Sequence, residues 1–149
     1  MLEQRIEQDI KAALLAGDSV KATTLRGLKA TLLNVKVAEG KRDSGLNDEE
    51  VIKILSKEAK KRQESADLYK QGGNNEKAEA ELTEKALIET YLPEQLSEDD
   101  INKIIDEVLA GMREVGLKDM GPVIGQVKAK AGAQADGAVI ARLVKEKLV

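Results

Sequence analysis

The sequence contains no cysteine and no histidine, and it has no tryptophan or phenylalanine. Without cysteine the chain can form no disulfide bond, and it offers neither a thiolate nucleophile nor a sulfur ligand for a metal. Without histidine it lacks the commonest general base and metal ligand. These absences argue against a conventional hydrolase and against a zinc site, and they leave the redox compartment undetermined. We therefore expect no metal site, no cofactor and no catalytic residue.

Aromatic residues make up only 1% of the chain, and both are tyrosines. The core must therefore consist of leucine, isoleucine, valine and alanine, which suit the packing of helix on helix, and base stacking on aromatic rings is nearly excluded. No apolar run approaches the roughly 20 residues of a membrane span, and the first residues, MLEQRIEQDI, contain no apolar signal core. The sequence predicts a cytoplasmic protein without a membrane partner.

What remains is a chain of 149 residues that is 42% apolar and 34% charged, typical of one globular domain or two small ones. The net charge of −3 argues against a strongly basic protein that coats nucleic acid, and we expect no DNA partner. From Gly116 onward basic residues outnumber acidic ones, whereas the preceding SEDDINKIIDEVLAGMRE is acidic. The surface should therefore be polarised.

Apolar residues recur every three or four positions along nearly the whole chain, which predicts an all-α fold with seven helices. The helices should begin near residues 2, 18, 47, 75, 97, 119 and 136. Turn-forming stretches separate them, and the fifth helix is expected to end at Gly116. Asn47 followed by Glu50 predicts a start like a capping box, and Asp119 and Asp136 are expected to cap the last two helices.

A domain boundary is expected at YLPEQLS, because Pro93 cannot continue a helix and biases Leu92 toward an extended conformation. The prediction is a helical N-terminal domain over residues 1–94 and a compact helical C-terminal module over residues 95–149.

The last helix pairs an apolar side with a basic one. Arg142 and Lys145 are three positions apart and share the face opposite the apolar side, so a phosphate backbone could approach them closely. Asp136 and Gly137 are better explained as a helix cap and a point of close backbone packing than as a substrate-binding turn. The candidate RNA-binding residues are Lys128, Lys130, Arg142, Lys145 and Lys147. The alternative, a lysine-rich end that only interacts with solvent, remains open.

A second basic patch lies on one broad face of the third helix, formed by Lys53, Lys57, Lys60 and Lys61. Glu58 and Glu64 lie among these lysines, so we favour a solvated helix over a nucleic-acid contact here. The carboxylates of the fourth helix could be imagined as an acid–base pair, but they lie in an alanine-rich helix without any sign of a pocket.

Several motifs resemble one protein family. The segments ETYLPEQLSEDDINKIIDEV and KDMGPVIGQVKAKAGAQADGAVIARLVKEKL are closely similar to the GatB/YqeY family, above all to its free-standing YqeY-like members. The stretches LRGLKATLLN and KEAKKRQES extend the resemblance over nearly the whole chain. The resemblance implies an N-terminal helical domain and a three-helix C-terminal module.

In the tRNA-dependent amidotransferase B subunit, the module that this C-terminal part resembles helps to hold tRNA. The resemblance therefore implies tRNA, or a tRNA-aminoacylation or amidation enzyme, as the partner. It also carries an association with carbon–nitrogen ligase activity that uses glutamine as amide donor. The ATP-using and amidase parts of that machinery have no counterpart here, so we expect an accessory protein that does not catalyse alone. The alternative is a protein-interaction adaptor that binds no RNA.

Overall fold

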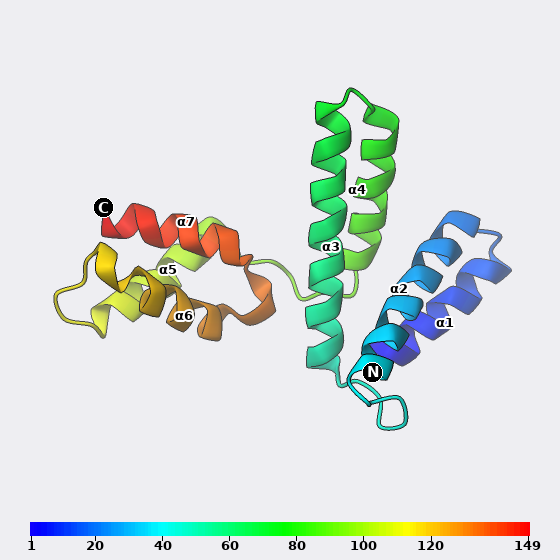
Figure 1. Cartoon of the computed structure of the whole chain (residues 1–149), viewed down its shortest axis with the longest axis horizontal. Helices are drawn as coiled ribbons and strands as arrows, with labels where there is room; N and C mark the ends of the chain where they lie inside the picture. The colour runs from blue at the N-terminus through cyan, green and yellow to red at the C-terminus, as the bar shows by residue number, and fades with distance from the viewer. The chain divides into compact units, whose positions relative to one another are not determined.

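The chain folds into seven α-helices without any strand, so the predicted all-α fold is confirmed. The computed structural model describes every residue from 1 to 149, and the chain divides into two compact units (Figure 1). Unit 1 comprises residues 1–92 and unit 2 comprises residues 93–149. None of the helices combines the length and the apolar composition that crossing a bilayer requires.

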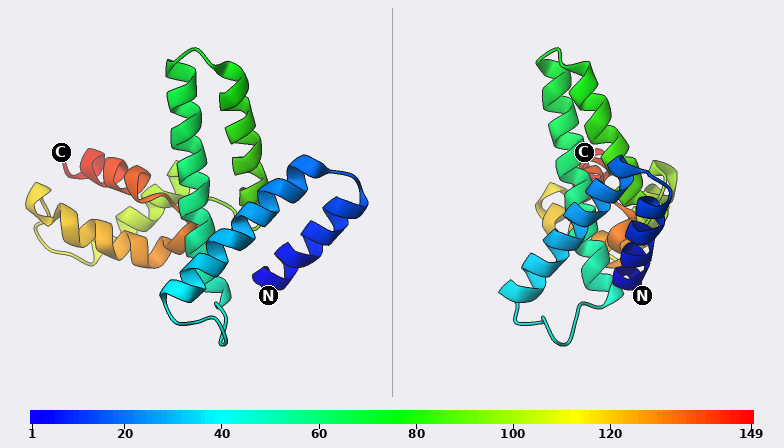
Figure 2. Two further views of the ribbon diagram at one scale, coloured as in Figure 1. Left: turned by 45° about the vertical axis from the view of Figure 1, so that its right-hand side comes forward. Right: turned by 90° about the vertical axis from the view of Figure 1, so that its right-hand side faces the viewer.

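Unit 1 consists of two helix pairs, visible in both views of Figure 2. Its helices are α1 (Leu2–Leu15), α2 (Ser19–Ala38), α3 (Asp48–Gln71) and α4 (Asn75–Glu89). Gly17 and Gly73 turn the chain within each pair, with φ angles of 72° and 78° that only glycine adopts without strain. Apolar side chains from all four helices form one core, which includes Ile6, Leu25, Leu28, Leu32, Val51, Leu55, Ile88 and Tyr91.

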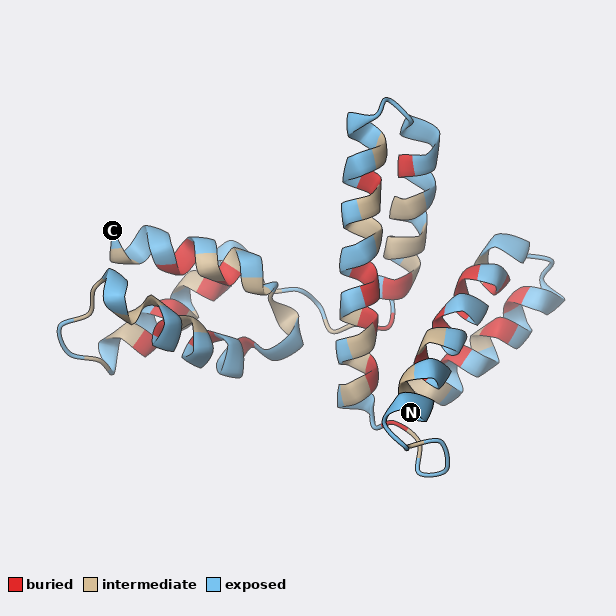
Figure 3. Cartoon of the chain, viewed as in Figure 1, coloured by how far each residue is buried: buried red, intermediate tan, exposed pale blue.

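Unit 2 is a three-helix module. Its helices are α5 (Glu98–Ala110), α6 (Met120–Ala131) and α7 (Gly137–Leu148), and two short 3-10 turns cover Leu117–Asp119 and Gly132–Gln134. Figure 3 shows the buried positions of these helices along their inward sides. They form a separate core of Ile101, Ile105, Val108, Val123, Val127, Ile140, Leu143 and Val144.

Side-chain caps explain where most helices begin. Asp18 accepts the Lys21 N–H at the start of α2 and is therefore its cap. Asn47 accepts the Glu50 N–H, as predicted. The reciprocal bond of a capping box is missing. The remaining side-chain caps are Asn74 for α4, Ser97 for α5 and Asp136 for α7.

Two details of unit 2 differ from the prediction. Helix α5 ends at Ala110, because Gly111, a poor helix former, closes it with a tightened bond to Val108, and not at Gly116. The Asp119 carboxylate accepts the Gly116 N–H at 2.9 Å and holds the 3-10 turn before α6, so it makes no cap bond to α6 itself.

Tyr91 anchors the end of α4 to α1. Its side chain is buried, and its hydroxyl donates a hydrogen bond to Asp9. The Arg5 guanidinium lies 4.7 Å from the centre of the tyrosine ring and donates to the Thr90 carbonyl at 3.3 Å. Burial, and then the bond to Asp9, raises the pKa of Tyr91 well above its ordinary value. The tyrosine of YLPEQLS therefore belongs to unit 1.

The other half of this motif is built into unit 2. The Leu96 N–H donates to the Gln134 carbonyl at 2.8 Å, and the Gln95 side chain donates to the Ala133 carbonyl at 3.1 Å. The Gln134 side-chain amide donates in turn to the Glu94 carbonyl at 3.3 Å. Leu96 also packs against the core of unit 2.

Candidate nucleic-acid interface

Helix α7 presents Arg142 and Lys145 on its exposed side, while Ile140, Leu143 and Val144 are buried on the other. The amphipathic arrangement predicted for this helix is therefore confirmed. Whether the exposed side binds RNA stays a prediction, and the neighbours of each cation decide how available its charge is.

The Arg142 side chain is paired with two carboxylates. Its guanidinium contacts the Glu98 carboxylate at the start of α5 and the Glu146 carboxylate at 3.2 Å on α7 itself. The bond to Glu98, and next the bond to Glu146, raises the pKa of Arg142 above its ordinary value. A phosphate that binds here must compete with two carboxylates.

Lys147 and Lys130 are also paired with α5. Lys147 Nζ lies 2.9 Å from Asp106, and Lys130 Nζ lies 3.6 Å from Glu107. Ion pairs between such exposed side chains contribute little stability and can exchange partners. The acidic segment noted in the sequence thus lies beside the basic one in space and pairs with its cations.

Lys128 and Lys145 have no carboxylate within ion-pair distance. A Cβ atom on Gly137 would lie 3.0 Å from Lys128 Cε and 3.1 Å from its Nζ. Gly137, predicted to admit neighbouring backbone, therefore makes room for this lysine side chain at the start of α7. Two of the five cations predicted for unit 2 remain unpaired.

In the second predicted patch, more of the cations are free of carboxylate partners. Lys53, Lys57 and Lys60 are exposed, share one face of α3 and have no carboxylate within ion-pair distance. Lys61, the fourth predicted member, instead contacts Glu58 at 3.2 Å. We call the first three the α3 lysine stripe. It extends for about 10 Å along the helix axis, given a rise of about 1.5 Å per residue.

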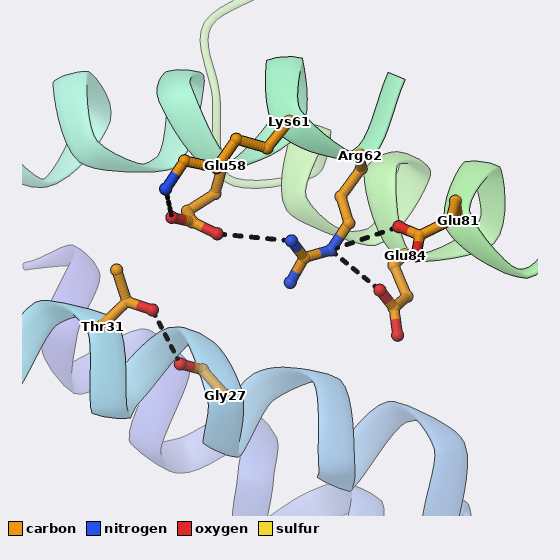
Figure 4. Close-up of polar contacts among 7 residues, drawn as sticks. All are labelled: Gly27, Thr31, Glu58, Lys61, Arg62, Glu81 and Glu84. Atoms are coloured by element: carbon orange, nitrogen blue, oxygen red, sulfur yellow. Dashed lines mark hydrogen bonds and ion pairs between the residues drawn. The ribbon is translucent and has the colours of Figure 1, made fainter. Parts of the chain in front are cut away.

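A partly buried charge cluster lies on the other side of α3 and was not predicted. Figure 4 shows Arg62 between α3 and α4, where its guanidinium lies 2.8 Å from Glu84, 3.4 Å from Glu58 and 3.8 Å from Glu81. Glu58 is only 7% exposed. A sequence signal existed, because Arg62 lies three positions after Ala59 and four before Ala66, both buried. Arg62 thus joins two helices and is not available to a partner.

The carboxylates of α4, weighed above as an acid–base pair, have structural roles or lie apart. Glu81 and Glu84 contact Arg62, and Glu89 contacts Lys85 at 3.3 Å. No three residues of the types that bind metal ions lie close enough together to share one.

Comparison with known proteins gives two kinds of relative. The protein named Altered inheritance of mitochondria protein 41, mitochondrial, from Eremothecium gossypii is 36% identical over 87 residues, which cover 58% of this chain and 46% of that protein. Its namesake from Clavispora lusitaniae is 27% identical over 123 residues, or 82% of this chain and 69% of that protein. These names place the yeast proteins in mitochondria, and a cytoplasmic location for this chain stays a prediction.

The second kind of relative is a glutamyl-tRNA(Gln) amidotransferase subunit. The one from Thermococcus sibiricus is 25% identical over 153 residues, which cover 99% of this chain but only 22% of that protein. The chain therefore spans about half the length of the first yeast relative and about a fifth of the amidotransferase subunit. The family model for Yqey-like proteins matches residues 3–148. This chain accordingly belongs to the YqeY-like family, which is related to part of an amidotransferase subunit.

Proposed function

We propose that this protein is a tRNA-binding accessory protein of glutamine-dependent tRNA amidation. One observation supports this above all: 99% of the chain aligns with part of a protein that is named as a glutamyl-tRNA(Gln) amidotransferase subunit. That protein is several times longer, so the whole enzyme's activity does not transfer to this chain. What the shared part can supply is a surface that holds the RNA or the enzyme.

The chemistry of the exposed lysines suits such a role. Phosphate contacts need mobile cations on a preformed surface, and they supply affinity without reading the base sequence. The α3 lysine stripe offers three cations without carboxylate partners, and Lys128 and Lys145 add two in unit 2. With two tyrosines and no other aromatic residue, base stacking contributes little. The binding would follow the shape of a folded RNA.

The proposal of an accessory role rests on the residue types that the chain contains. The chain supplies no histidine and no cysteine, and its inward-facing carboxylates on α4 contact Arg62. In this proposal its residues bind and orient the RNA, and a separate enzyme transfers the amide.

The test is the binding of full-length protein to total tRNA over a salt series. With three to five phosphate contacts, the logarithm of the association constant should fall by about 2 to 4.5 per tenfold rise in salt. Absence of binding at low salt, or binding that does not respond to salt, would overturn the proposal.

A second candidate function is a protein-interaction adaptor that binds the amidation enzyme but no RNA. The observation that favours it is the pairing of Arg142, Lys130 and Lys147 with carboxylates of α5, which leaves less free charge on unit 2. The variant Arg142→Glu/Lys145→Glu separates the two. It should weaken tRNA binding if the first function is right, and binding to purified glutamyl-tRNA amidotransferase should be unaffected if the partner docks on unit 1.

A further inference from the structure

The α3 lysine stripe is a short basic segment with an acidic residue at each end. Along the outward face of α3, at spacings of three or four positions, the exposed residues are Glu49, Lys53, Lys57, Lys60 and Glu64. Neither glutamate lies within ion-pair distance of a lysine of the stripe, so positive and negative charge stay separated along this face. A polyanion on the stripe is therefore attracted over about 10 Å of the helix and repelled beyond both ends.

The stripe is also only one side chain wide. Lys61 and Arg62 follow Lys60 in the sequence, but both are engaged with Glu58, at 3.2 Å and 3.4 Å (Figure 4). They therefore do not widen the row of unpaired cations. A single row of three lysines can neutralise at most three phosphates, and these must belong to one strand of a nucleic acid or to neighbouring points on it.

No group beside the stripe would hold an unpaired base. Stacking of bases needs an exposed aromatic ring or the plane of an arginine, and the stripe contains only lysine. Tyr91 is buried in the core of unit 1, and the Lys77 ammonium lies 5.7 Å from the centre of the half-buried Tyr69 ring. A single strand is flexible, so ordering it on α3 would cost conformational entropy that no stacking contact offsets.

A double-helical stem matches these properties. Base pairing already holds its phosphates in place, so binding orders little of the RNA. Its bases stack on one another and need no aromatic partner from the protein. Each strand winds round the axis of the stem, so it meets a straight α-helix over a few phosphates and then turns away. Such a strand would contact the lysines and stay clear of Glu49 and Glu64.

We propose that the α3 lysine stripe binds one strand of a double-helical RNA stem, and that this strand crosses α3 between Glu49 and Glu64. The inference rests on the proposed function and deepens it, because it names the part of a folded RNA that unit 1 contacts. Lysines act as point charges and read no bases, so stems of different sequence should bind alike. The two glutamates select against a strand that lies along the helix, because they repel its phosphates.

The experiment measures the binding of two RNAs to the full chain by fluorescence anisotropy at low salt, with total tRNA as a third ligand. One is a hairpin with an uninterrupted stem, and the other is an unstructured uridine oligomer with the same number of phosphates. The wild-type chain should bind the hairpin about tenfold more tightly. In Lys53→Glu/Lys57→Glu/Lys60→Glu, the ratio of the two affinities should fall toward one.

The matched control for this loss is Lys11→Glu/Lys21→Glu/Lys70→Glu, which changes the net charge of the chain equally. A duplex has a higher charge density than a single strand, so any cationic surface prefers it to some extent. The control variant retains the α3 lysine stripe and should keep the wild-type ratio of affinities.

A second variant tests the crossing. Glu49→Lys/Glu64→Lys extends the row of cations to about 22 Å. A flexible strand can lie along such a row, so the affinity for the uridine oligomer should rise about tenfold, whereas the affinity for the hairpin should rise about threefold at most. Both positions are exposed, so the fold should be retained. The control Glu76→Lys/Glu79→Lys makes the same change of charge on α4 and should raise both affinities equally.

Different results overturn different claims. If the full chain binds no tRNA at low salt, the proposed function fails, and this inference fails with it. If tRNA binds but the hairpin is bound no more tightly than the uridine oligomer, or if the triple stripe variant keeps the wild-type ratio, only the inference about the stem fails. If Glu49→Lys/Glu64→Lys raises both affinities equally, the strand does not cross α3 between these glutamates.

Discussion

The two units carry similar side chains but expose their positive charge differently. In unit 1 the outward side of α3 presents Lys53, Lys57 and Lys60 without carboxylate partners, while Arg62 is turned inward to α4. In unit 2 three of the five candidate cations, Arg142, Lys147 and Lys130, pair with carboxylates of α5. A count of lysines and arginines therefore does not tell how much positive charge is available to a partner, because neighbouring helices decide which cations are already paired.

The largest effect should come from the inward arginine of unit 1. In Arg62→Met, the buried carboxylate of Glu58 keeps only the exposed Lys61 as a partner, and Glu81 and Glu84 lose their contact to α3. The free energy of unfolding should therefore fall by about 2 to 3 kcal/mol. This loss of stability is smaller than the loss expected for a fully buried ion pair, because the Arg62 side chain is 27% exposed. The matching change in unit 2, Arg142→Met, should leave stability unchanged within error, since its partners are exposed. Urea unfolding measures both.

A double variant serves as the control for this prediction. Glu58→Gln removes the buried charge, so Glu58→Gln/Arg62→Met should be more stable than Arg62→Met alone. If the two variants are equally unstable, lost packing of the long arginine side chain, and not the unpaired carboxylate, explains the effect.

The next effect concerns RNA affinity. Reversing the α3 lysine stripe in Lys53→Glu/Lys57→Glu/Lys60→Glu should weaken tRNA binding about 100-fold at low salt and reduce the salt slope by about 2 to 3. The control Lys11→Glu/Lys21→Glu/Lys70→Glu changes the net charge equally at other lysines of unit 1 and should weaken binding far less. Filter binding or fluorescence anisotropy measures both. Equal losses would mean that only total charge matters.

A smaller effect of opposite sign is expected in unit 2. Glu98→Gln/Asp106→Asn/Glu107→Gln removes the carboxylates that pair with Arg142, Lys147 and Lys130, so those cations become free. Affinity for tRNA should then rise about threefold to tenfold if α7 faces the RNA.

The control for that gain is Glu94→Gln/Asp99→Asn/Glu114→Gln, which removes three acids of unit 2 that pair with no cation. It should raise affinity less, because it frees none of the candidate residues. If the two triple variants raise the affinity for tRNA equally, α7 does not contact the RNA. The two units then differ in available positive charge by more than the ion pairs to α5 account for.

The smallest predicted effect is a loss of stability at high pH. It concerns unit 1, because both tyrosines lie there. The pKa of Tyr91 is raised in the folded protein, so its stabilising contribution is complete below the ordinary tyrosine value of 10.0 and is lost as pH rises above it. Tyr91→Phe should cost about 1 kcal/mol at pH near 8 and less at pH near 11. Tyr69→Phe is the control, and urea unfolding at the two pH values is the measurement. An equal cost at both values would contradict the prediction.

The sequence predicts the helices well because their signals are local. Apolar spacing, turn glycines and capping side chains such as Asn47 and Asp136 act within a few residues of the helix that they define. The errors are local as well, since Gly111 ends α5 before the stronger-looking signal at Gly116.

The candidate site could be predicted only in part, because ion pairs between helices depend on distances that no short segment encodes. Nothing near Arg142 in the sequence shows that Glu98, 44 positions away, will contact it. Arg62 is the exception. Its place in the apolar stripe of α3 was a readable sign that it turns inward, although it stands in a run of basic residues.

The connection between the units also bears on how such proteins can be assembled from parts. Tyr91 is built into the fold of unit 1 and Leu96 into that of unit 2, so each unit keeps its own end of the YLPEQLS segment. Pro93 lies between these anchors and has no N–H to contribute to either fold. The segment is a natural junction for gene fusion and fission: a coding sequence cut there and joined to another would divide neither hydrophobic core.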